Sequence, residues 1–209
     1  MLADDHEMMR RGLRAILIEQ RGWEICGEAA DGRQAVELAQ KLRPDVIVMD
    51  IAMPELNGLE ATRQIRRAVP RAEILVLTSD ESETLVRDVL MAGARGYVMK
   101  SDVSRVLVQA VENLSHHRPY FTSKVAEVLL KEFGREKGIL ESTGDPLTSR
   151  EREVVQLVAE GKSTKEVAQV LNLSVKTAEN HRTNIMRKLK VNSATELVRY
   201  AIRNKIATP

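Results

Sequence analysis

The 209-residue sequence predicts two domains: an α/β domain with a doubly wound parallel sheet, followed by a smaller all-α domain of four helices. In the first half, short apolar runs alternate with segments of helical length, whereas every local signal in the last third is helical. The balance of basic and acidic residues also differs between the two predicted domains. Residues 1–120 carry 16 lysine and arginine residues against 19 acidic ones, and residues 147–209 carry 12 against six. A basic second domain points to a polyanion as its partner.

Three apolar runs in the first half each stop at a polar residue. They are Val46–Met49 before Asp50, Ile74–Leu77 before Thr78, and Tyr97–Met99 before Lys100. Continuous apolar runs of this length are typical of parallel strands that are covered on both faces. Segments of helical length lie near 7–20, 31–43, 58–69, 82–93 and 103–117. Strand and helix in repetition imply right-handed crossovers, which produce a doubly wound sheet.

The first strand is short, because only Met1–Ala3 precede the acidic pair Asp4 and Asp5. A strand usually has about five residues. Either this strand is a stub, or the natural chain begins upstream. We hypothesise that an upstream segment completes the strand, so that appending about four apolar-rich residues raises the thermal stability.

The alternation of apolar runs with segments of helical length stops near residue 119. Residues 119 to 146 are expected to be an interdomain linker that contains a helix over Phe121–Phe133. The domains are therefore predicted at 1–118 and 147–209. In the second domain, N-cap residues predict helices that start near 149, 164, 175 and 194. A helix that ends near Leu171 and another that begins at Val175 would form a helix-turn-helix. Ala178, Ile185 and Leu189 are spaced to face its core.

Composition places the chain among ordinary globular proteins, with 43% hydrophobic and 30% charged residues. No apolar run approaches the roughly 20 residues of a membrane helix, and no secretion signal is visible, so we expect a cytoplasmic protein that does not bind a membrane. The single cysteine, Cys26, cannot form an internal disulfide. It lies in the stretch Trp23–Cys26 and is expected to be a small buried strand residue.

The polar residues that end the strands are the candidate site, because ligands of doubly wound sheets bind outside the carboxyl ends of the strands. Asp4, Asp5 and Asp50 would repel one another there, and Mg²⁺ would relieve this repulsion. An aspartate can attack a phosphoryl group, and a lysine and a hydroxyl such as Lys100 and Thr78 can stabilise the transferring oxygens. Each residue alone could be an ordinary strand end or surface loop. Their placement at successive strand ends favours phosphoryl chemistry.

Residues 1–118 resemble the receiver domain of response regulators, which has a flavodoxin-like fold. The resemblance is carried by four blocks in order: Ala3–His6, Asp50–Gly58, Leu77–Ser79 and Gly96–Lys100. It implies that Asp50 accepts phosphate from a sensor histidine kinase and ligates Mg²⁺ together with Asp5, with Asp4 acting mostly through water. The backbone carbonyl of Ala52 would add a ligand. The resemblance also implies roles for three further residues: Thr78 as switch hydroxyl, Tyr97 as switch aromatic and Lys100 as phosphate contact. His6 is assigned no chemistry.

Residues 147–209 resemble the LuxR-type helix-turn-helix of the NarL/FixJ regulators. The matching stretches are Leu147–Val154, Ser163–Ala168, Leu173–Thr177, His181–Arg182 and Ile185–Leu189. Base edges would be read from the start of the second helix by Lys176, Thr177 and Asn180, with Asn184 and Arg187 on the same face. Phosphate contacts are expected from Arg182, Lys188, Lys190, Lys162, Ser163 and Thr164. The last helix, with Leu197, Val198 and Tyr200, would provide the contact of a homodimer, and part of this apolar stripe must instead pack on the second helix.

The two resemblances predict a transcriptional regulator that binds double-stranded DNA, is controlled by phosphorylation on Asp50 and is not an enzyme. Two alternatives stay open for the first domain. It could be a phosphatase or other hydrolase with Asp50 as nucleophile, or a dimerisation platform that signals without phosphate. The second domain could instead be a helical interaction domain with a solvated basic face, which a salt-insensitive affinity would reveal. The kinase, the signal, the operator and the sign of regulation are not encoded in any motif.

Overall fold

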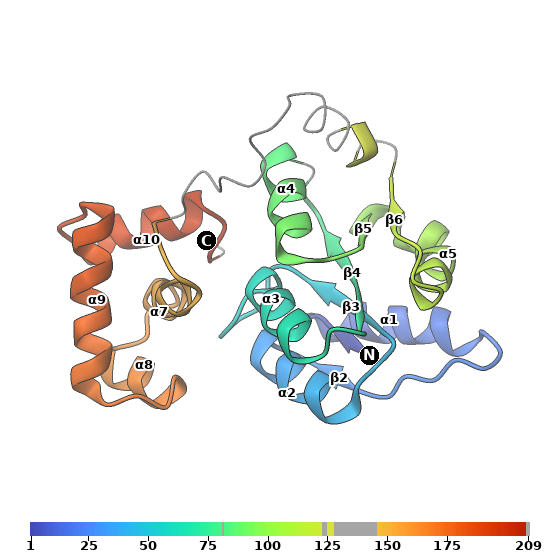
Figure 1. Ribbon diagram of the computed structural model, residues 1–209, viewed down its shortest axis with the longest axis horizontal. Coiled ribbons are helices and arrows are strands. Elements are labelled where there is room, and N and C mark those ends of the chain that lie inside the picture. Colours follow the sequence, from blue (N-terminus) through green and yellow to red (C-terminus); the bar gives the residue numbers. More distant parts are fainter. Residues whose placement is uncertain (81, 123–124, 128–145, 208–209) are drawn as a thin grey trace. The chain divides into compact units, whose positions relative to one another are not determined.

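The computed structural model describes residues 1–80, 82–122, 125–127 and 146–207 (Figure 1). The chain divides into two compact units, an α/β unit and a helical unit, and each is described by itself. No helix in these described ranges is long and apolar enough to cross a bilayer.

The α/β unit is built on one parallel sheet of six strands, in the order β2-β1-β3-β4-β5-β6. The strands are β1 (Leu2–Ala3), β2 (Glu28–Ala29), β3 (Val46–Asp50), β4 (Glu73–Thr78), β5 (Gly96–Met99) and β6 (Tyr120–Phe121). Strands β3 and β4 are almost fully buried, which explains why their sequences are continuously apolar. The predicted doubly wound parallel sheet is confirmed.

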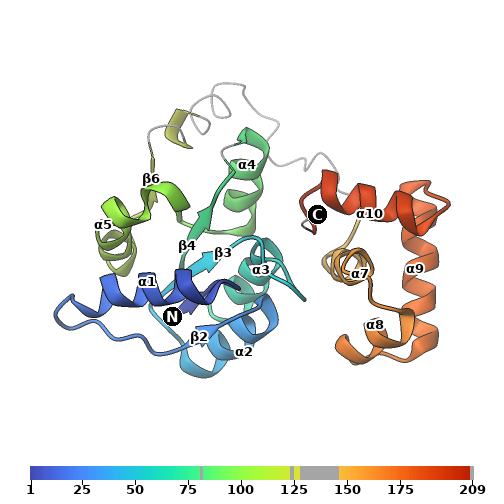
Figure 2. The ribbon, with the colours of Figure 1, turned by 180° about the vertical axis from the view of Figure 1, so that it is seen from behind.

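Five helices connect these strands and cover both faces of the sheet. They are α1 (Glu7–Ile18), α2 (Gly32–Leu42), α3 (Gly58–Ala68), α4 (Glu83–Ala92) and α5 (Val103–Ser115). Figures 1 and 2 show α1 and α5 on one face, and α2, α3 and α4 on the other. Two of these helices start at a side-chain N-cap. The side chain of Asp31 accepts a hydrogen bond from the amide of Gln34 at 2.8 Å, and that of Ser82 caps α4 in the same way.

The sequence-based expectations are wrong at two places. Tyr120–Phe121 pairs with β5 as a sixth strand, so the helix expected over Phe121–Phe133 does not begin at Phe121. Residues 125–127 are helical, and residues 123–124 and 128–145 lie outside the described residues. Cys26 is half-buried and lies outside any strand. The reason is that β1 begins opposite Glu28, so it offers no residue to pair with the stretch Trp23–Ile25.

The helical unit contains α7 (Ser149–Ala159), α8 (Thr164–Val170), α9 (Val175–Leu189) and α10 (Ala194–Arg203). All four helices start where the N-cap residues predicted. Thr148 and Ser163 form reciprocal capping boxes with the glutamates three residues later. At α10, Ser193 accepts from the amide of Glu196, but that carboxylate bonds to the amide of Asn192 instead of Ser193. Ala178 and Ile185 are fully buried in the core, and Leu189 packs against it, as expected.

Candidate functional site

The carboxyl edge of the parallel sheet gathers the predicted phosphoacceptor residues. Asp4 follows β1, Asp50 closes β3, Thr78 closes β4 and Lys100 follows β5. The register keeps these strand ends level, since Asp50 lies opposite Leu77 and Thr78 lies opposite Met99. Side chains that are up to 96 residues apart in sequence therefore meet at one edge.

Asp50 is the buried centre of this site, with 2% of its surface exposed. Its Oδ1 accepts a hydrogen bond from the amide of Ile51 at 2.8 Å, and its Oδ2 lies 3.0 Å from Nζ of Lys100. Burial raises the pKa of Asp50, and the neighbouring Asp4 raises it further, although Lys100 and the Ile51 amide act in the opposite direction. The carboxylate is thus held in a place where its negative charge is costly.

Lys100 pairs with two buried carboxylates at once. Its Nζ donates to Oδ2 of Asp4 at 2.9 Å, besides its contact with Asp50. Burial alone would lower the pKa of Lys100, but the hydrogen bond to Asp4 and the charge of Asp50 outweigh burial and raise it. The lysine is therefore a fixed positive charge at the carboxyl edge of the sheet.

The acidic pair lies beside Asp50 and is held by the backbone around it. The amide of Asp4 donates to the carbonyl of Ala29 at 3.2 Å, and Oδ1 of Asp4 accepts from the amide of His6 at 2.8 Å. Asp5 is more exposed, and its Oδ1 lies 2.7 Å from Nδ1 of His6. Ligand atoms of Asp4, Asp5, His6 and Asp50 all lie within 4.8 Å of one another.

This group of side chains fits a hard divalent cation, because three of its four members offer carboxylate oxygens. Asp5 and His6 are exposed, so a hydrated cation can reach the cluster from solvent. Ala52 lies two residues after Asp50 and is exposed in the same turn. Sequence reasoning gave His6 no part here, although its position directly after the acidic pair was a usable signal.

Two residues near the site were missed by sequence reasoning. Arg10, on α1, donates through its guanidinium to the carbonyl oxygen of Asp4 at 2.7 Å. Gly58 donates its amide to the carbonyl of Ile51 at 2.9 Å, and it packs so closely on β3 that a side chain would clash with Asp50. The Asn57-Gly58 turn signal was visible in the sequence, but its close approach to Asp50 was not.

Thr78 and Tyr97, the two expected switch residues, both form hydrogen bonds to the backbone of Asp80. Oγ1 of Thr78 accepts from the amide of Asp80 at 3.0 Å, and the hydroxyl of Tyr97 donates to the carbonyl of Asp80 at 2.5 Å. Tyr97 is 2% exposed. The ring of Tyr97 is therefore turned inward in this structure.

The face of α9 opposite the core presents the predicted base-reading side chains. Lys176, Asn180, Asn184 and Arg187 are all exposed, while Thr177 is half-buried beside them. The side chain of Lys176 is 79% exposed, and its Nζ lies 3.5 Å from Oε2 of Glu179. This helix face is free of core contacts, as a groove-reading helix requires.

Two basic residues among the predicted phosphate contacts, Arg182 and Lys188, also have partners inside the helical unit. Arg182 donates to Oγ1 of Thr164 at 3.5 Å, which links α9 to the start of α8. Nζ of Lys188 donates to Oε2 of Glu151 at 2.7 Å. Burial would raise the pKa of Glu151, but the hydrogen bonds from Lys188 and Thr148 lower it overall. Lys162 and Ser163 precede α8, with Ser163 exposed as its N-cap.

Both halves of the chain match family models. Residues 1–112 match the response regulator receiver domain, and residues 145–201 match the luxR family of bacterial regulatory proteins. The chain belongs to the response regulators. The order of its two domains, and its relatives, place it with the NarL/FixJ type.

Curated relatives of this response regulator are similar over nearly their whole length. The transcriptional regulatory protein LiaR of Bacillus subtilis (strain 168) is 41% identical over 206 residues, covering 99% of this chain and 97% of LiaR. The oxygen regulatory protein NreC of Staphylococcus carnosus (strain TM300) is 39% identical over 211 residues, with 99% and 97% covered. This response regulator is therefore a DNA-binding transcriptional regulator by family.

A solved structure of the same kind supports this assignment. RcsB from Salmonella enterica serovar Typhimurium, bound to promoter rprA in the presence of the phosphomimetic BeF3−, is 28% identical to this response regulator. The match covers 95% of each chain with a TM-score of 0.58. Both the receiver fold and the helical unit thus have counterparts in a DNA-bound regulator.

Proposed function

We propose that this response regulator is phosphorylated on Asp50 in a Mg²⁺-dependent reaction, and that the phosphate controls its binding to double-stranded DNA. One observation carries the proposal: the buried Oδ2 of Asp50 lies 3.0 Å from Lys100, beside the acidic cluster. This is a nucleophilic carboxylate next to a fixed cation and a set of oxygen ligands.

The residues at the carboxyl edge of the sheet would have separate roles in phosphoryl transfer. Oδ2 of Asp50 forms the new bond to phosphorus, and the bond from phosphorus to the donor's leaving group breaks. Lys100 offsets negative charge on the transferring oxygens, and the hydroxyl of Thr78 donates to one of them after releasing its contact with Asp80. Asp4, Asp5, Asp50 and the carbonyl of Ala52 would hold Mg²⁺, which neutralises developing charge when it is bound. Tyr97 would transmit the effect of phosphorylation to the surface of α4.

The helical unit supplies the proposed DNA interface. Lys176, Thr177 and Asn180 would reach base edges from the first turns of α9, with Asn184 beside them. Arg182, Lys188 and the start of α8, formed by Lys162, Ser163 and Thr164, would contact phosphates. The domain boundaries follow as 1–118 for the receiver, 119–146 for the linker and 147–209 for the DNA-binding domain. Strand β6 extends the receiver's sheet into the first linker residues.

The partners follow from this scheme. We propose a sensor histidine kinase as the phosphate source, a homodimer in the phosphorylated or DNA-bound state, and a cytoplasmic location. A solved structure of two RcsB dimers on two parallel DNAs supports the dimer. We propose that the chain acts as a regulator and not as an enzyme, because the curated relatives that it matches over nearly its whole length are transcriptional regulatory proteins.

The experiment is the uptake of phosphate from acetyl phosphate by the full chain, followed by mass spectrometry. Wild type with Mg²⁺ should gain one phosphoryl group, and neither Asp50→Asn nor wild type with excess chelator should gain it. Phosphorylation in Asp50→Asn would place the acceptor elsewhere. Continuous release of phosphate over many turnovers per minute would favour a hydrolase instead.

A further inference from the structure

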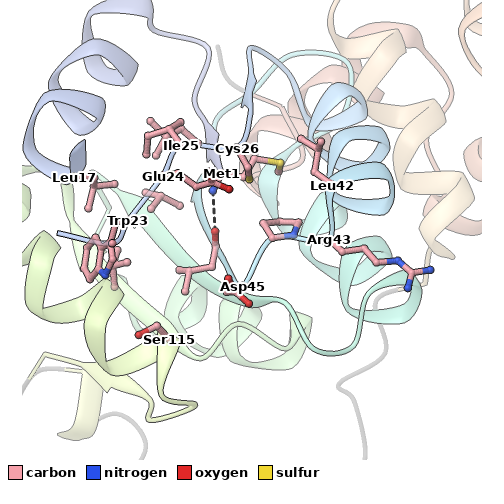
Figure 3. Close-up of a pocket in the computed structure, with 16 residues that line it drawn as sticks. Met1, Leu17, Trp23, Glu24, Ile25, Cys26, Leu42, Arg43, Asp45 and Ser115 are labelled. Carbon is pink, nitrogen blue, oxygen red and sulfur yellow. Dashed lines mark hydrogen bonds between the residues drawn. The ribbon is translucent and has the colours of Figure 1, made fainter. Parts of the chain in front are cut away.

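The strand β1 has different surroundings at its two ends. At the amino end, a cavity of about 590 Å³ lies beside Met1, with the side chain of Trp23 in its wall (Figure 3). At the carboxyl end, β1 is followed directly by the acidic pair Asp4 and Asp5. None of the described residues that line the cavity belongs to the acidic cluster, so Trp23 can report on folding without touching the candidate site.

The acidic pair begins where the pairing of β1 with β2 ends. The last register pair joins Ala3 to Ala29, and the amide of Asp4 donates to the carbonyl of Ala29 at 3.2 Å. Beyond this bond the backbone leaves the sheet and turns into α1. The direction of the Asp5 side chain therefore depends on the peptide group between Asp4 and Asp5, because the plane of that group fixes where the next Cα lies.

Arg10 holds this peptide group from α1. Its Nη1 donates to the carbonyl oxygen of Asp4 at 2.7 Å, and its Nε lies 3.5 Å from Oε2 of Glu28 in β2. Only 16% of the Arg10 side chain is exposed, so the guanidinium lies within the packed layer between α1 and the sheet. A guanidinium is planar and rigid. Its ion pair with Glu28 therefore also fixes the nitrogen that meets Asp4.

The two carboxylates of the acidic pair are held to different degrees. That of Asp4 is fixed twice, because Oδ1 accepts from the amide of His6 and Oδ2 accepts from Nζ of Lys100. That of Asp5 meets Nδ1 of His6, whose side chain is 70% exposed. A contact with an exposed side chain constrains its partner weakly. The peptide group that Arg10 holds is therefore the main constraint on the direction of Asp5.

We propose that Arg10 is a positioning residue for the metal site: by holding the carbonyl of Asp4, it orients the carboxylate of Asp5 toward the cation site shared with Asp50. The inference rests on the proposed function, which makes these carboxylates ligands of Mg²⁺. Replacing a residue that orients metal ligands typically weakens metal binding by about 10- to 100-fold. Loss of the positive charge of Arg10 by itself would have the opposite effect, because it removes repulsion of the cation.

The first experiment measures the dissociation constant of Mg²⁺ by titration calorimetry on the full chain, in the wild type, Arg10→Gln and Arg14→Gln. Arg14 is the matched control, because it lies one turn further along α1 and donates to the same Glu28, but has no bond to Asp4 within the described residues. Arg10→Gln should raise the dissociation constant by about 10-fold or more. Arg14→Gln should leave it unchanged or lower it. Unchanged or tighter binding in Arg10→Gln would overturn the proposal.

A second measurement separates positioning from a loss of folding. The rate of phosphorylation by acetyl phosphate is followed against the Mg²⁺ concentration, with the emission of Trp23, the protein's only tryptophan, as a check of the fold. Arg10→Gln should need about 10-fold more Mg²⁺ for half of the maximal rate, and it should reach the wild-type rate at saturation. A lower maximal rate at an unchanged Mg²⁺ requirement, with unchanged Trp23 emission, would show that Arg10 acts on another step and would overturn the proposal.

Arg10→Lys keeps the test decisive if Arg10→Gln disturbs folding. Lysine keeps the charge but replaces the planar fork with a single ammonium, which cannot hold Asp4 and Glu28 in one fixed geometry. This variant should also bind Mg²⁺ more weakly than the wild type, and an equal affinity would show that charge alone suffices. The proposed function fails separately: a wild type that binds no Mg²⁺ removes the metal site itself, whereas equal binding by the wild type and both Arg10 variants removes only the role of Arg10.

Discussion

A β-carbon on Gly58 would lie 1.9 Å from the carbonyl oxygen of Asp50. The start of α3 therefore packs directly on the backbone of the proposed phosphoacceptor, and only a glycine leaves room for this contact. The turn from Asp50 to Gly58 is closed by the same approach, since the amide of Gly58 also bonds to Ile51. The shape of the site thus depends on a residue that has no side chain.

Gly58→Ala should destabilise the protein and slow its phosphorylation. The clash is with backbone, which cannot rotate away, so we expect a loss of about 2 kcal/mol or more in the free energy of unfolding. Gly12→Ala is the matched control, because Gly12 lies inside α1 and a β-carbon there meets nothing within 4 Å. That change should stabilise by roughly 0.5–1 kcal/mol. Urea unfolding measures both, and equal effects at the two glycines would refute the close approach.

Asp50→Asn should stabilise the unphosphorylated protein at neutral pH in the absence of Mg²⁺. The pKa of Asp50 is raised in the fold, so its ionised form costs stability as the pH rises from the ordinary value of 3.8 through the folded pKa. We expect a gain of about 1 kcal/mol, or a melting temperature about 2–4 °C higher. The gain should shrink as the pH falls toward 3.8. Thermal melts at several pH values check this. If the stability gain of Asp50→Asn grew on acidification, the raised pKa of Asp50 would not be its cause.

Mg²⁺ should stabilise the wild type, because a cation relieves the repulsion within the acidic cluster. A ligand at about 100 times its dissociation constant adds about 2.7 kcal/mol to the free energy of unfolding. Asp5→Asn should remove most of this gain while leaving the fold intact, since Asp5 lies at the exposed side of the cluster. Glu7→Gln, two residues later on the exposed face of α1, should keep it. Melts with and without Mg²⁺ separate the two variants.

Lys188→Met should lower the stability of the helical unit in a pH-dependent way. The pKa of Glu151 is lowered in the fold through its bond to Lys188, so the pair stabilises above the ordinary pKa of 4.5 and loses its effect as the pH falls through the folded pKa. We expect a loss of about 1 kcal/mol at pH 7, because the lysine is partly exposed. Lys190→Met, at the end of the same helix, is the control for charge alone. A loss that persists at low pH would indicate packing instead.

Arg182→Gln should weaken binding to all DNA sequences alike and reduce the slope of log affinity against log salt by about 1. Lys176→Met should instead change the preferred sequence, because Lys176 lies exposed on the side of α9 that we propose to face the groove. The probes are duplexes that the wild type selects from a random pool. Arg203→Gln, in the last turn of α10, removes the same charge and should leave the slope unchanged. An unchanged slope in Arg182→Gln would exclude the phosphate contact.

Helix starts were predictable from the sequence because they depend on residues within one turn. Thr148, Ser163 and Ser174 cap the helices that they were expected to cap. Strand β6 was not predictable in the same way. Tyr120–Phe121 is too short to show a period, and it becomes a strand only because the edge of β5 is there to pair with it.

The sequence by itself determined which residue types stand at the strand ends and which face of α9 is polar, because hydrophobic periodicity and capping are local. Tertiary structure decided that Lys100 bonds Asp4 as well as approaching Asp50, that Lys188 is tied to Glu151, and that a cavity lies beside Met1. These contacts join residues far apart in the chain. Their distances are set by the register of the sheet and the packing of the helices, which no local pattern encodes.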